Sequence, residues 1–128
     1  MNAKRSAPTF EAKIYVGFRK AYSSDYPDVS NCLWKAREAC REAVKDGWCV
    51  TLQPLEYIYT PTYTVGQTEP VDGEPGVVIG AINYPRFPSK PEALKERCIE
   101  LADKLMNTLE QERVSIVFSD ETVLLERI

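Results

Sequence analysis

The chain has no histidine, and this absence excludes several kinds of active site at once. A Ser-His-Asp triad, a Cys-His pair, a histidine general base and the usual zinc sites all need an imidazole. The four cysteines form no CxxC pair and show no metal-finger spacing. Cys32, Cys40 and Cys98 fall on or near apolar helix faces, where they are expected as small buried hydrophobic residues. We therefore predict no metal site, no cofactor and no catalytic residue.

Familiar catalytic and phosphate-binding motifs are also missing. The sequence contains no GxxxxGK[ST] loop, GxGxxG fingerprint, nucleophile elbow or HExxH. Neighbouring carboxylates do occur, but all lie in expected turns, where they usually face solvent or cap the backbone; the pairs are Asp25 with Asp28, Asp72 with Glu74, and Asp120 with Glu121. On this basis we expect a protein that is not an enzyme.

Long apolar runs are absent as well. No run approaches the roughly 20 residues that span a bilayer, and the opening MNAKRSAPTF lacks the apolar core of a signal peptide. A net charge of −3 argues against broad attraction to long nucleic acid or an anionic membrane. We expect a cytoplasmic protein with neither of these partners.

The chain does contain two strand and helix units in succession. Alternating or continuous apolar residues predict strands at 14–18, 49–59, 77–82, 114–118 and 123–125, with Pro54 marking a break or bulge in an edge strand. Apolar stripes predict helices at about 30–47, capped by Ser30, and 90–111. The 128 residues fit a single domain. This order predicts an α+β fold of the ferredoxin-like β-α-β-β-α-β type, with an antiparallel sheet, two helices on one face and an extra C-terminal strand.

Two segments and one sheet face remain outside this core. Residues 1–11 are expected to form a flexible arm, and residues 60–75 a long loop that is a lid, a partner-contacting arm or simply mobile. The sheet face away from the helices would leave apolar side chains partly exposed, namely Tyr15, Val78 or Ile82, and Val117. We expect the terminal arm or another subunit to cover them, which favours a homo-oligomer.

The stretch 76–92, GVVIGAINYPRFPSKPE, is the strongest candidate for a binding site. Two prolines stiffen the turn after the strand, and Ser89 with Glu92 is typical of a helix capping box. In this turn Asn83 could read the edge of a base, Arg86 could bind a phosphate, and Tyr84 or Phe87 could stack on a ring. Alternatively, the two rings pack beneath the turn and Arg86 points to water.

A second group of candidate residues lies at the other end of the expected sheet. Arg19, Tyr22 and Tyr26 follow the first strand; separately, Arg113 begins a later strand and could contribute charge. One subunit could not easily bring them to the turn at 83–89, whereas two subunits could do so in a shared pocket. We therefore predict interfacial pockets in an oligomer.

Three blocks of the sequence resemble small bacteriophage proteins: IYVGFRKAYSSD, EPGVVIGAINYPRFPS and RVSIVFSDETV. Over about residues 13–126 the chain is similar to the first class of Thoeris anti-defence proteins, the phage sponges that sequester immune signals of the cyclic ADP-ribose type. The resemblance implies an oligomer, in an infected bacterial cell, that binds cyclic nucleotides without cleaving them, with possible further sites for cyclic oligonucleotides. It places Asn83, Arg86 and Phe87 in the pocket, together with Arg113.

Two other classes of function stay open. A protein-binding inhibitor could act through the loop at 60–75 and the uncovered sheet face. A small nucleotide-processing enzyme would instead change its ligand chemically.

Substitution of Arg86 tests the predicted anion site. We expect Arg86→Ala to weaken binding of an anionic cyclic nucleotide by about 2 kcal/mol, because a charge-assisted hydrogen bond is lost, while folding is nearly unchanged. Calorimetric titration with cyclic ADP-ribose measures this, and an unaltered affinity would remove Arg86 from the site.

Overall fold

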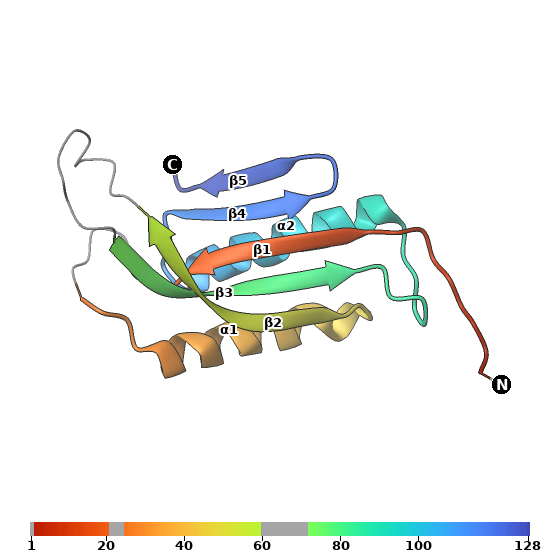
Figure 1. The fold of residues 1–128 in the computed structure, drawn as a ribbon, viewed down its shortest axis with the longest axis horizontal. Coiled ribbons are helices and arrows are strands. Elements are labelled where there is room, and N and C mark those ends of the chain that lie inside the picture. The colour runs from red at the N-terminus through yellow and green to blue at the C-terminus, as the bar shows by residue number, and fades with distance from the viewer. Residues whose placement is uncertain (1, 21–24, 60–71) are drawn as a thin grey trace.

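The computed structural model describes residues 2–20, 25–59 and 72–128, which form one sheet and two main helices (Figure 1). In chain order the elements are β1 (Glu11–Gly17), α1 (Val29–Ala43), the short 3₁₀ helix η1 (Val44–Asp46), β2 (Val50–Tyr59), β3 (Asp72–Ile82), α2 (Pro91–Thr108), β4 (Arg113–Phe118) and β5 (Thr122–Glu126). The strands lie in the order β2-β3-β1-β4-β5, and each neighbouring pair is antiparallel. The predicted α+β, ferredoxin-like fold with an extra C-terminal strand is confirmed.

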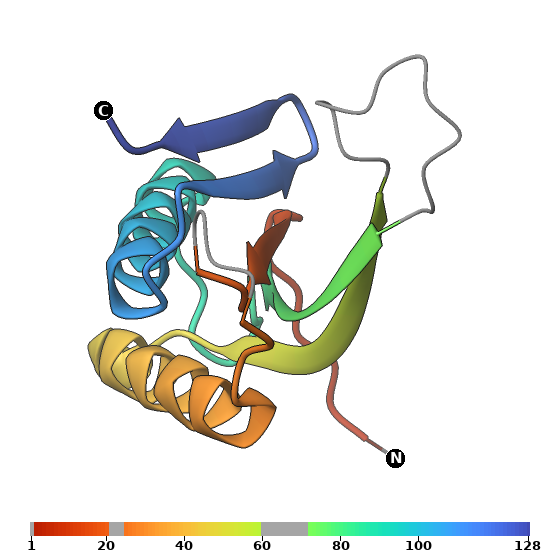
Figure 2. The ribbon, with the colours of Figure 1, turned by 90° about the vertical axis from the view of Figure 1, so that its left-hand side faces the viewer.

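Both helices lie on the same face of the sheet (Figure 2). Alternation along the two central strands explains this arrangement, because every second side chain points to that face. Ile14 and Val16 of β1 and Val77 and Ile79 of β3 are fully buried there. Helix α2 covers them with the predicted apolar stripe, whose buried members are Leu94, Cys98, Leu101, Ala102, Leu105, Met106 and, just beyond the helix, Leu109.

The helix starts differ from the sequence expectation. Asp28, not Ser30, is the N-cap of α1, and its carboxylate accepts a hydrogen bond from the Asn31 N–H. Helix α2 begins at Pro91 with Lys90 at the N-cap position and no side-chain cap. The predicted capping box of Ser89 and Glu92 is therefore wrong. The reason is that the Ser89 backbone is held by a different side chain, as described below.

Strands β2 and β3 also differ from the prediction. Their pairing runs without interruption from Val50 opposite Ala81 to Tyr59 opposite Asp72, so the expected break or bulge at Pro54 is absent. Pro54 is accommodated because β2 is an edge strand, as predicted. Since β2 is long, its partner β3 starts at Asp72, inside the segment expected to be a loop. Residues 60–71, and with them the proposed lid or arm, lie outside the described residues.

The sheet face opposite the helices carries apolar side chains, as expected. Tyr15 and Val78 are half-buried, whereas Ile82, Val117 and Leu124 are 49%, 40% and 51% exposed. We call this surface the open face. Among the helices that the structure describes, none is long and apolar enough to cross a membrane.

Candidate functional site

Asn83 is buried and holds the turn between β3 and α2 in place. Its side-chain amide donates hydrogen bonds to the carbonyl oxygens of Pro8 (2.7 Å) and Ser89 (2.9 Å). Its Oδ1 accepts a hydrogen bond from the Ser89 N–H (2.9 Å). Both amide hydrogens are thus engaged with the backbone, and they tie the N-terminal segment to the turn.

The other residues of this turn are on the surface. Tyr84 and Phe87 are each 40% exposed, and their ring centroids are 5.0 Å apart, so they contact each other. Arg86 is exposed. Binding of a ligand by this turn stays a prediction.

The remaining predicted site residues lie at the opposite end of the sheet, as expected from the order of elements. Tyr26 is 71% exposed, and the Arg113 side chain, also exposed, is 4.0 Å from the Glu126 carboxylate. Tyr22 lies outside the described residues. Arg19 follows β1, and its guanidinium donates a hydrogen bond to the Gly73 carbonyl (3.3 Å). Arg19 is therefore part of a cluster with the start of β3.

That cluster brings a carboxylate and a phenol together over two glycines on the open face. Gly17 of β1 lies opposite Gly76 of β3, and Tyr57 of β2 lies opposite Glu74. A side chain at position 17 would place its β-carbon 3.0 Å from Glu74 Oε1. One at position 76 would place its β-carbon 2.5 Å from the Val16 carbonyl oxygen and 2.9 Å from the Tyr57 ring. The Glu74 carboxylate and the Tyr57 ring therefore occupy the space that the glycines leave. We call Gly17, Gly76, Glu74 and Tyr57 the glycine-floor site.

Hydrogen bonding and burial define the electrostatics of this site. The backbone N–H of Arg19 donates to Glu74 Oε2 at 2.8 Å, which holds the carboxylate. Burial raises the pKa of the Tyr57 hydroxyl well above its usual value, and the nearby Glu74 charge and then Tyr15 raise it further. Tyr57 is therefore a phenol at neutral pH. It can donate a hydrogen bond but cannot act as a nucleophile or general base.

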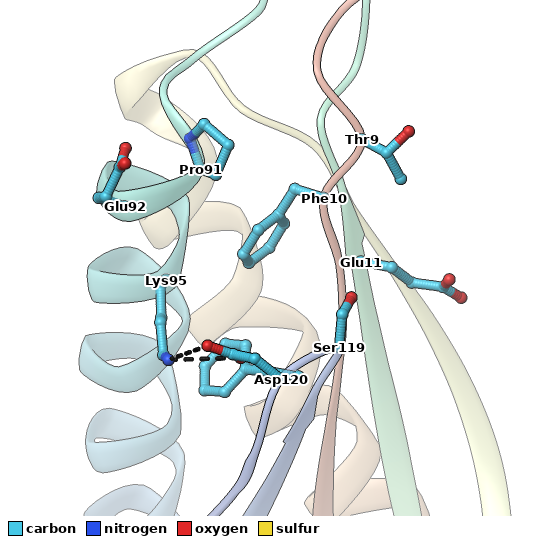
Figure 3. A pocket seen from close by; sticks show the side chains of 9 residues that line it. Thr9, Phe10, Glu11, Pro91, Glu92, Lys95, Ser119 and Asp120 are labelled. Carbon is cyan, nitrogen blue, oxygen red and sulfur yellow. Dashed lines mark hydrogen bonds and ion pairs between the residues drawn. The ribbon is translucent and has the colours of Figure 1, made fainter.

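A hollow of about 360 Å³ lies at the end of the sheet away from the glycine-floor site (Figure 3). Its aromatic wall is Phe10 beside Phe118, with ring centroids 6.1 Å apart. Lys95 lies 4.9 Å above the Phe118 ring and forms an ion pair with Asp120 at its rim. The lysine is thus already neutralised by this contact and a second one, to Glu121.

Two of the four cysteines, Cys40 and Cys98, are buried. Burial raises the pKa of the Cys40 thiol to about 11 and that of Cys98 to about 12, so both are protonated and unreactive at neutral pH. All four cysteines are free thiols. Among the described residues, no group of three or more Cys, Asp or Glu side chains could hold a metal ion.

Comparison with known proteins gives matches in structure but not in sequence. No protein-family model matches the chain, and no curated protein matches it. Two solved structures share its fold. Both are of phage SAM (S-adenosylmethionine) lyase. The apo structure has a TM-score of 0.66 and 17% sequence identity, covering 92% of this chain and 89% of that chain. The complex with S-methyl-5′-thioadenosine has a TM-score of 0.67 and 17% identity, covering 99% and 96%.

These neighbours contradict the expectation that the protein is not an enzyme, because the structures that share its fold are named as lyases. The comparison agrees with the expected likeness to phage proteins, but the proteins found are not signal-sequestering sponges. The expectation rested on the absence of histidine and of known motifs.

Sequence reasoning missed both Glu74 and Tyr57. The richness of residues 60–75 in proline and glycine placed Glu74 in a solvated turn, whereas it lies in β3 and is half-buried. One signal in the sequence could have indicated the glycine-floor site: each of two strands has a glycine at one end. Gly17 follows an alternating run, and Gly76 precedes an apolar run. Only the register shows that they lie opposite each other.

The hydrogen bonds of Asn83 lead to a prediction about stability. We expect Asn83→Ala to lower the free energy of unfolding by about 2 to 3 kcal/mol, because three hydrogen bonds to the backbone of Pro8 and Ser89 are lost. Urea denaturation measures this change. Arg86→Ala, in the same turn but exposed, serves as the control and should leave the unfolding curve unchanged; equal effects of the two variants would contradict the role of Asn83.

Proposed function

We propose that the protein binds S-adenosylmethionine at the glycine-floor site and cleaves it as a lyase, releasing S-methyl-5′-thioadenosine. The observation that carries this proposal is the shared fold over 99% of the chain with a lyase that is bound to that nucleoside. We also propose that the protein acts in an infected bacterial cell. There, consumption of a host metabolite would be its anti-defence activity.

The chemistry of the substrate explains how a site without histidine could catalyse this reaction. S-adenosylmethionine carries a sulfonium, which is a ready leaving group, and a carboxylate in the same amino-acid chain. Attack by that carboxylate on the carbon next to sulfur breaks the carbon–sulfur bond, and the electron pair returns to sulfur as a neutral thioether. The four-carbon fragment leaves as a lactone, and no water or external base is consumed.

Opposite charges cancel as this reaction proceeds. A partly buried site that excludes water and folds the amino-acid chain back on itself therefore favours the transition state. We propose that the Glu74 carboxylate and the Tyr57 ring, which cover the two glycines, form one wall of such a site.

Two side chains of the glycine-floor site have roles that fit this substrate. We propose that the Glu74 carboxylate binds the ammonium group of the substrate, whose charge does not change during cleavage. This contact would orient the amino-acid chain of the substrate so that it folds back on itself. We assign the Tyr57 hydroxyl, which is held protonated, to a hydrogen-bond acceptor on the nucleoside. Arg19 supports Glu74 through its backbone N–H.

A second copy of the chain is the proposed cover for the open face. Ile82, Val117 and Leu124 expose apolar surface there, and the glycine-floor site lies on the same face. A homo-oligomer would exclude water from these side chains and enclose the substrate between subunits.

Incubation with S-adenosylmethionine tests the proposed activity. We expect the purified protein to form S-methyl-5′-thioadenosine, detected by chromatography and mass spectrometry. Glu74→Gln should lower kcat/KM roughly 10- to 100-fold, because the charge-assisted hydrogen bond to the ammonium is lost. Glu42→Gln, an exposed carboxylate on α1, is the matched control and should retain full activity.

The alternatives give different results in the same assay. Recovery of S-adenosylmethionine intact from a stable complex would indicate sequestration and contradict cleavage. If the protein does not bind S-adenosylmethionine but binds cyclic ADP-ribose, the result would favour a signal-sequestering sponge.

Native mass spectrometry tests the proposed oligomer. We expect an oligomer for the wild type and a monomer for Val117→Glu, because a charge on the open face would be buried without a partner at the contact. Trp34→Glu replaces a residue on α1 that is 59% exposed, in the opposite layer of the fold, and should leave the assembly intact. A wild-type protein that is monomeric at micromolar concentration would overturn this arrangement.

A further inference from the structure

Gly17 lies directly beneath the Glu74 carboxylate. The three atoms nearest to a β-carbon at position 17 all belong to that group: Oε1 at 3.0 Å, and Cδ and Oε2 at 3.1 Å. These contacts are tighter than nine in ten contacts of real β-carbons, so the carboxylate would have to move by a few tenths of an ångström to admit a methyl group here.

The backbone conformation does not require glycine at position 17. Among the described glycines, only Gly47 has a positive φ, of 94°. Gly17 is the last residue of β1 and is paired with Gly76 in regular antiparallel register. Any residue could adopt its backbone angles. What glycine provides at this position is therefore space above its Cα, which the Glu74 carboxylate occupies.

The register explains how the carboxylate reaches this space. The pairing of β1 with β3 continues past Gly17, because the Phe18 N–H donates a hydrogen bond to the Pro75 carbonyl at 3.0 Å. The next residue, Arg19, comes opposite Glu74, and its N–H donates to Glu74 Oε2 at 2.8 Å. The side chain of Glu74 thus crosses from β3 to β1 and lies flat over Gly17.

We propose that Gly17 is a positioning residue, whose missing side chain lets the Glu74 carboxylate lie against β1 and so fixes where the cationic group of the substrate binds. This inference rests on the proposed function for its consequence in catalysis, but the contact between positions 17 and 74 does not. One hydrogen-bond donor to the carboxylate is the backbone N–H of Arg19, which no side-chain substitution removes. A β-carbon at position 17 would displace the carboxylate without removing this donor.

A double-mutant cycle on stability tests the contact without any substrate. With Glu74 present, Gly17→Ala should shift the folding equilibrium toward the unfolded state by roughly two- to tenfold, because the displaced carboxylate loses its hydrogen bond to the Arg19 N–H. In the Glu74→Ala background the clash is gone, and Gly17→Ala should instead favour the native state by about two- to fivefold, because alanine restricts the unfolded chain. All variants are compared at one protein concentration, since an oligomer's stability depends on it.

Gly80→Ala is the matched control for this cycle. Gly80 lies on the same face of β3 as Gly76, but a β-carbon there would meet the Thr51 hydroxyl at 2.6 Å rather than Glu74. Its effect should therefore be the same in the wild-type and Glu74→Ala backgrounds. If Gly17→Ala is likewise additive with Glu74→Ala, Gly17 does not position the carboxylate and the inference is wrong.

Steady-state kinetics then test the consequence for the site. We expect Gly17→Ala to lower kcat/KM for S-adenosylmethionine by roughly 10- to 100-fold, since small displacements of a positioning group are costly. It should cause little further loss in the Glu74→Gln background, where the charge is already absent. Full activity of Gly17→Ala would overturn the role in catalysis. A wild-type protein that is inactive but shows the stability coupling would overturn the proposed function and leave the contact established.

Discussion

The antiparallel pairing of β1 with β3 is the constraint on which the rest of this structure depends. It puts Ile14 opposite Ile79 and Val16 opposite Val77, and all four are fully buried beneath the helices. Because side chains alternate along a strand, a slip of one residue would move this apolar set to the open face. Burial of the core therefore fixes the register, and the same register brings Gly17 opposite Gly76.

The arrangement of the glycine-floor site is thus a consequence of the register that the core fixes. Once Gly17 and Gly76 lie side by side on the open face, a patch of backbone without side chains exists between β1 and β3. Glu74 and Tyr57 fill its edges from β3 and β2, and the Arg19 N–H holds the carboxylate. The turn at 83–89, which attracts attention in the sequence, is stabilised by Asn83 at the far end of the sheet.

The lack of histidine excludes less when the fold is known than it does when the sequence is considered alone. It excludes catalysis that depends on an imidazole, and the fold shared with SAM lyases shows that a scaffold of this kind is compatible with an enzyme. Cleavage of a sulfonium needs orientation and exclusion of water more than a proton carrier. The absence of known motifs therefore limits the mechanisms that the protein could use. It does not decide between an enzyme and a binding protein.

The sequence by itself determined the order of the elements, the two amphipathic helices and the ferredoxin-like class, because these follow from local periodicity and chain order. It also indicated the uncovered sheet face and the edge position of β2. Only the tertiary structure decided three further features. Strand β3 starts at Asp72, the Asn83 side chain holds the turn by hydrogen bonds, and Glu74 contacts Gly17. Each of these depends on contacts between residues far apart in the chain, such as positions 17 and 74, whose register no local pattern contains.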